Sequence, residues 1–116
     1  MTDKQLLHVI LDMARDGGYS LDEIWGALRG HYAISDEQSM RRQVRAAIGQ
    51  LIDSGYVSLS HRVGPGQYRQ LESSELRRLN ESERGWGIGE DTPEPNLNVS
   101  ATQKGVAALG RGEFSS

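Results

Sequence analysis

The strongest pattern of apolar and polar positions lies in the middle of the chain. Apolar residues recur there at intervals of three and four, which predicts one long amphipathic helix over residues 35–54: Met40, Val44, Ala47, Ile48, Leu51 and Ile52. Gly55 follows at the position where many helices end on a left-handed residue. Val57, Leu59 and Val63 then alternate with polar residues, so the chain is expected to pass directly from this helix into a half-buried strand.

Two shorter helices are predicted before the long one. The first has a broad apolar face and stops at Gly17-Gly18, and the second carries Trp25 as a core residue and ends at Gly30. Capping boxes, in which two side chains three residues apart satisfy each other's backbone N–H groups, predict where the three helices begin: Thr2 with Gln5, Ser20 with Glu23, and Ser35 with Gln38.

The strand after the long helix is expected to open a β-hairpin. Gly64-Pro65-Gly66 predicts a tight turn, after which residues 67–71 return as a second strand with Tyr68 facing inward. The pattern weakens over about residues 72–95. A structureless run of this length is unusual in a compact domain, so we interpret it as an elaborated or mobile segment.

Regular structure is predicted again near the C-terminus. Residues 97–99 form a short strand, and Thr102 is expected to cap a last helix that contains Val106, Ala107 and Leu109. The chain is therefore a single α+β domain over residues 1–110, followed by a flexible tail at 111–116.

Composition excludes several kinds of chemistry. The chain has no cysteine, which excludes disulfides, thiolate catalysis and cysteine-ligated metal. His8, His31 and His61 lack the paired spacing of metal ligands, so no metal or other cofactor is expected. No catalytic frame stands out among the acidic residues, and we expect no enzymatic activity. The absence of a membrane-spanning apolar run and of a signal-peptide pattern predicts a cytoplasmic protein without a membrane partner.

The predicted order of helix, helix, helix, strand, turn and strand is that of a helix-turn-helix followed by a hairpin wing. At residues 44–57 the chain also resembles the passage from recognition helix to wing in bacterial winged-helix transcriptional regulators. The run Ala101-Thr102-Gln103-Lys104-Gly105 is similar to the entry to the final helix of that superfamily. The resemblance covers about residues 2–71 and 97–109, whereas about 72–95 departs from it.

The resemblance implies a winged helix with a three-helix core, a β-hairpin wing and a C-terminal helix. It also implies a homodimer that pairs through the first and last helices. A dimer would supply two recognition helices for a two-fold symmetric site on double-stranded DNA.

The expected DNA contacts follow from the side chains. The face of helix 35–54 opposite Val44 and Leu51 carries arginine and glutamine, the side chains for bidentate readout of guanine and adenine, and Ala46 and Gly49 would let DNA approach closely. Arg41 lies nearer the buried flank and is expected to meet a phosphate or a neighbouring carboxylate. The wing, 56–71, would contact phosphates. The candidate DNA-binding residues are Gln38, Ser39, Arg41, Arg42, Arg45, His61, Arg62 and Arg69.

Charge leaves a second hypothesis open. The net charge is -3 and the pI is about 5.6, whereas nucleic-acid binders usually carry a basic balance or a basic stripe. Asp36, Glu37 and Asp53 could neutralise the arginines of the long helix. The alternative is a winged-helix module that binds a protein partner, or dimerises, without binding DNA.

Overall fold

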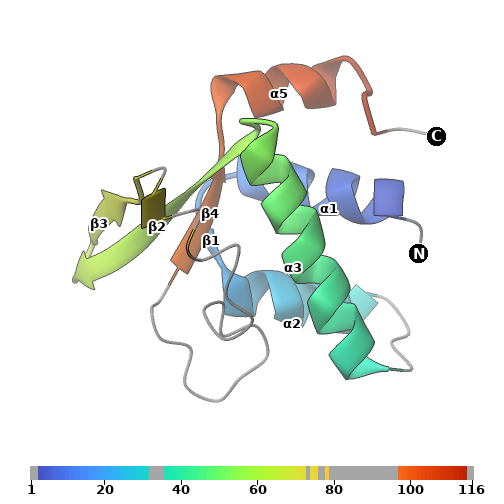
Figure 1. The fold of residues 1–116 in the computed structure, drawn as a ribbon, viewed down its shortest axis with the longest axis horizontal. Helices are drawn as coiled ribbons and strands as arrows, with labels where there is room; N and C mark the ends of the chain where they lie inside the picture. Colours follow the sequence, from blue (N-terminus) through green and yellow to red (C-terminus); the bar gives the residue numbers. More distant parts are fainter. Residues whose placement is uncertain (1–2, 32–35, 73, 76–77, 79–96, 115–116) are drawn as a thin grey trace.

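The computed structural model describes residues 3–31, 36–72, 74–75, 78 and 97–114 of the 116-residue chain. It combines α-helices with one antiparallel four-stranded sheet (Figure 1). In chain order the elements are α1 (Asp3–Arg15), β1 (Tyr19–Ser20), α2 (Leu21–His31), α3 (Glu37–Asp53), β2 (Val57–Gly64), β3 (Gln67–Gln70), β4 (Leu97–Ala101) and α5 (Gln103–Gly110). The α+β class predicted from the sequence is confirmed.

The core lies between the helices and one face of the sheet. Val57 and Leu59 of β2 are buried, as are Leu97 and Val99 of β4, while the residues between them are partly exposed. This alternation is the period of two expected for a sheet with one covered face. Apolar stripes of α1, α2 and α3 complete the core, and Trp25 is buried as predicted, with 4% of its surface exposed.

The junction between α3 and β2 follows the prediction closely. Gly55 has φ +77°, the left-handed conformation that glycine adopts without a steric penalty. Its N–H donates to the carbonyl of Ile52, and the N–H of Tyr56 donates to the carbonyl of Leu51, both at 2.9 Å. These two bonds are those of a Schellman C-cap, so α3 ends and the strand begins within three residues.

Helix α5 is joined to this same corner. Thr102 caps α5 by accepting from the N–H of Gly105 at 3.1 Å, as predicted, and its hydroxyl donates to the carbonyl of Gly55 at 2.6 Å. Its own N–H donates to the carbonyl of Tyr56 at 2.9 Å. The Lys104 ammonium lies 5.6 Å from the centroid of the Tyr56 ring. We call this group of contacts between residues 55–56 and 102–105 the corner clasp.

The sheet order is β1-β4-β2-β3, so the strand nearest the C-terminus lies in the interior of the sheet. Strand β4 pairs with β1 on one side and with β2 on the other, with Leu59 opposite Val99. The two-residue strand β1 was not expected, because so short an extended segment leaves no alternation in the sequence. The predicted hairpin forms between β2 and β3, but β3 occupies the edge.

Three predicted details are corrected by the structure. Helix α3 is capped by Asp36, whose carboxylate accepts from the N–H of Ser39 at 3.2 Å, and not by Ser35, which lies outside the described residues. Tyr68, predicted to face inward, has 52% of its surface exposed; it lies opposite Arg62 on the edge strand β3, all four residues of which are exposed. Phe114, within the predicted flexible tail, packs edge-on against Tyr56 with ring centroids 6.0 Å apart.

Other predictions are met in the structure or fall outside it. Ser20 and Glu23 form the reciprocal capping box at the start of α2, with both hydrogen bonds at 3.1 Å. The cap predicted at Thr2 lies outside the described residues, as does most of the segment 72–95.

Candidate nucleic-acid interface

Helix α3 has one buried side and one exposed side. Val44, Ile48 and Leu51 are at most 1% exposed and hold the helix against the core. Gln38, Arg42, Gln43, Ala46 and Gln50 are exposed. Two of the predicted DNA-binding residues, Gln38 and Arg42, therefore lie on the open face of α3.

Arg41 is on the flank of α3 that faces α2. Its guanidinium lies 5.6 Å from the centroid of the Trp25 ring and 3.8 Å from the carboxylate of Glu37. The carboxylate of Glu37 also forms an ion pair with the guanidinium of Arg29 in α2, at 2.9 Å. Arg41 thus meets a neighbouring carboxylate, one of the two partners expected from its position, and it helps to join α2 to α3.

Ser39 and Arg45 are partly buried. The N–H of Ser39 is used by the Asp36 cap, and its hydroxyl accepts from the amide of Gln43 at 3.4 Å. Gly49, expected on the open face, is buried. The open face of α3 is therefore narrower than the helical wheel indicates, and it is centred on Arg42, Ala46 and Gln50.

A hollow of about 500 Å³ lies beside this face, between α3 and the start of α1. Helix α1 crosses behind α3 in Figure 1. The α1–α3 hollow is lined by Asp3, Leu6, Leu7, Ser39, Arg42, Gln43, Ala46, Ala47 and Gln50. The helical wheel of α3 could not reveal it, because the hollow needs the first two turns of α1 as its other wall.

The hairpin carries the remaining candidates. The backbone of β2 and β3 brings His61 opposite Arg69 in the register, and Arg62 opposite Tyr68. His61 is half-buried and Arg69 is exposed. The side chain of Arg62 lies outside what the structure describes. The hairpin tip and the first turn of α3 lie at opposite sides of the view in Figure 1, so the candidates form two separate groups.

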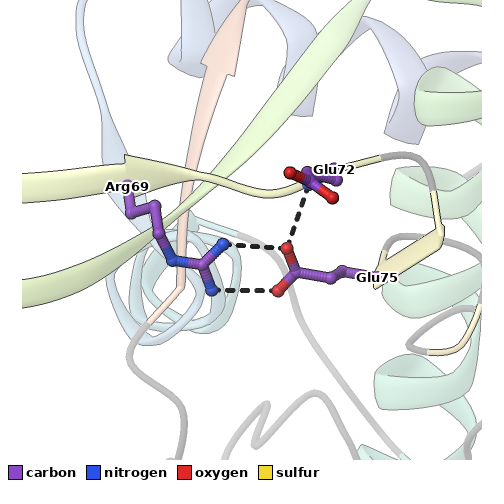
Figure 2. Close-up of polar contacts among 3 residues, drawn as sticks. All are labelled: Arg69, Glu72 and Glu75. Carbon is purple, nitrogen blue, oxygen red and sulfur yellow. Dashed lines mark hydrogen bonds and ion pairs between the residues drawn. The ribbon is translucent and has the colours of Figure 1, made fainter.

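Arg69 is already paired. Figure 2 shows its guanidinium in a two-pronged contact with the carboxylate of Glu75, at 2.8 and 2.9 Å, while the N–H of Glu72 donates to the same carboxylate at 3.3 Å. The hydrogen bonds from Arg69, and then the one from the Glu72 backbone, lower the pKa of Glu75 to about 2. The positive charge expected on the hairpin is therefore partly neutralised by an acid six residues further along the chain.

The described residues hold no group of three or more histidine or acidic side chains arranged to bind a metal ion. In the same part of the chain, no helix has both the length and the apolar character needed to cross a bilayer.

Comparisons of the chain with protein-family models, with curated proteins and with solved structures each find no match.

Proposed function

We propose that the protein is a winged-helix DNA-binding protein that regulates transcription and has no enzymatic activity. The observation that carries the proposal is the open face of α3, where Gln38, Arg42 and Ala46 are exposed on a helix whose other side is anchored in the core. A helix held in this way can enter the major groove, where arginine and glutamine read guanine and adenine. The order of α1, α2, α3 and the β2–β3 hairpin supports the same assignment.

The hairpin would contribute phosphate contacts. It extends away from the helices in Figure 1, on the other side of the molecule from the first turn of α3. A duplex that receives α3 in its groove can meet such a projection along its backbone, and His61, Arg62 and Arg69 are the basic side chains available there. A homodimer, which would present two copies of α3 to a two-fold symmetric site, is part of the proposal.

The charge distribution sets the expected strength of binding. Glu37 pairs with Arg41 and Arg29, and Glu75 pairs with Arg69, so three arginines of the described residues already have a carboxylate partner. We therefore expect weak non-specific binding and a shallow salt dependence. Affinity would come mainly from base contacts made by α3 at a preferred sequence.

Fluorescence anisotropy against mixed genomic fragments tests the proposal. The native chain should bind a subset of fragments with a Kd below about 1 µM, and the double variant Arg42→Ala/Arg45→Ala should bind them at least about tenfold more weakly. Arg111→Ala, an exposed arginine that pairs with Glu113 after α5, is the matched control. Binding that is micromolar at best and equal in the three proteins would rule out DNA recognition by α3.

The alternative function is a protein-interaction module of the same fold. Strand β3 favours it, because an exposed edge strand can accept a strand from a partner, and Tyr68 on this strand is 52% exposed. A pull-down with nuclease added discriminates between the two functions. A specific partner retained without nucleic acid, and lost in Tyr68→Ala, favours this alternative.

A further inference from the structure

We propose that the α1–α3 hollow binds a small organic monocarboxylate with an apolar body, and that this ligand competes with DNA for Arg42. The ligand site is argued from the hollow itself, whereas the competition rests on the proposed function.

The size of the hollow suits a small molecule. Its volume of about 500 Å³ lies within the usual range of about 300–1,000 Å³ for ligand sites. Where α3 lines the hollow, it contributes the small residues Ala46 and Ala47. A longer side chain at Ala46, which is exposed, would occupy the space directly.

The lining is divided between apolar and hydrogen-bonding groups. Leu6 and Leu7 of α1 are buried core residues that also line the hollow, and together with the two alanines they supply an apolar surface. Gln43, Gln50 and Ser39 supply amide and hydroxyl groups on the α3 side. An apolar surface with a few polar groups is the usual composition of a site for a small amphipathic molecule.

Charge selects the polar end of the ligand. Five other arginines of the described chain pair with carboxylates: Arg15, Arg29, Arg41, Arg69 and Arg111. Arg42 has no carboxylate within ion-pair distance among the described residues, so its guanidinium can receive a carboxylate through two parallel hydrogen bonds. Asp3 lines the hollow from α1 and would repel a second anionic group, which favours a monocarboxylate.

The hollow and the proposed DNA-reading face share Arg42, Ala46 and Gln50. A carboxylate held by Arg42 would remove the guanidinium from base or phosphate contact and would add negative charge beside the groove. Ligand and DNA would therefore exclude each other at this helix.

Binding is measured on the full chain without DNA, by amide chemical shifts in NMR titrations. The probes are phenylacetate, 4-phenylbutyrate and octanoate, each compared with its uncharged amide. At least one acid should shift the amides of Leu6, Leu7, Arg42 and Ala46 saturably with a Kd of about 1 mM or below, and about tenfold more tightly than its amide. Benzylmalonate, which carries two carboxylates, should bind more weakly than 4-phenylbutyrate.

Two variants and one control locate the site. Arg42→Gln should weaken acid binding about tenfold, and Ala46→Leu should abolish it by filling the space while keeping the charge. Both positions are exposed on a helix, so both variants should fold. Arg111→Gln should leave binding unchanged. If no acid binds, if acid and amide bind equally, or if Ala46→Leu binds as the native chain does, the site is refuted.

The competition has its own readout. In the anisotropy assay, the acid at saturation should raise the Kd for a bound fragment at least about fivefold, and the amide should not. Acid binding without any DNA binding would refute the proposed function and leave the ligand site intact. DNA binding that the bound acid does not weaken would refute the competition alone.

Discussion

Gly105 in the first turn of α5 lies directly against the backbone carbonyl of Tyr56, at the start of the sheet. A Cβ placed on Gly105 would overlap that carbonyl oxygen and would lie 2.9 Å from the carbonyl carbon. It would also lie 3.1 Å from a methyl group of Leu11. The absence of a side chain at Gly105 therefore allows α5 to pack this closely on the corner where α3 becomes β2.

Gly105→Ala should destabilise the protein although alanine favours helix. The methyl group meets backbone atoms, which cannot move aside as a flexible side chain would, and we expect a loss of about 2–3 kcal/mol in the free energy of unfolding. Urea denaturation followed by circular dichroism measures it. Gly110→Ala in the same helix is the control, because a Cβ there meets nothing within 4 Å, and it should be neutral or slightly stabilising. Equal effects of the two substitutions would contradict the close packing.

Thr102→Val should lower stability by about 1–2 kcal/mol, because valine keeps the shape and removes the hydroxyl. That hydroxyl caps α5 through the Gly105 N–H and donates to the Gly55 carbonyl. Thr102→Ser retains both bonds and should cost less than about 0.5 kcal/mol. The same denaturation assay compares them, and a valine variant as stable as the serine variant would show that the corner clasp contributes no net stability.

The Arg69–Glu75 pair predicts a pH dependence. The folded pKa of Glu75 is about 2, below the ordinary value of 4.5, so the pair stabilises the fold above about pH 4.5 and this contribution is lost as the pH falls towards 2. The side chains are partly exposed, which keeps the contribution small. Carboxyl carbon shifts in an NMR pH titration measure the pKa. Arg69→Gln should return it towards 4.5, and Arg111→Gln should not; an unchanged pKa in Arg69→Gln would contradict the pairing.

Glu75→Gln should strengthen non-specific DNA binding, because Arg69 then presents its charge on the hairpin. Under the proposed function we expect affinity for random duplex to rise about threefold at low salt and the slope of log K against log salt to steepen by about 1. Anisotropy titrations at several salt concentrations measure both. Glu113→Gln, which frees Arg111 instead, is the control. A slope that does not change in Glu75→Gln would mean that Arg69 makes no phosphate contact.

Features set by local interactions were predictable from the sequence. The α3–Gly55–β2 passage follows from a helical apolar period, a glycine and an alternating strand within about two dozen residues. The caps at Ser20 and Thr102 likewise involve residues three apart. The cap of α3 was displaced by one residue, because serine and aspartate stand side by side there and both are good N-caps.

Features set by distant residues were not predictable in the same way. Tyr68 was expected to face inward, but its strand, β3, lies at the edge of the sheet. Alternation within residues 67–71 cannot reveal this position, because it depends on β4, almost thirty residues later, pairing with the other side of β2. The pairing of Arg69 with Glu75 depends on how the chain leaves the hairpin. The α1–α3 hollow joins residues from the first and third helices, and only their packing brings them together.

The sheet order also predicts where a segment of the chain can be replaced without loss of the fold. The N–H of Leu71 donates to the carbonyl of Leu59 at 2.9 Å from one side of β2. On the other side of β2, the chain resumes with Leu97 opposite His61, two residues along the same strand. Among the described residues, β2 and β4 pair directly and bury Leu59 and Val99 together. We expect replacement of residues 76–95 by a Gly-Ser linker of about eight residues, which keeps the Arg69–Glu75 pair, to retain the thermal transition, measured by circular dichroism. A retained transition would mean that this segment can change in sequence and length without altering the fold of the described residues.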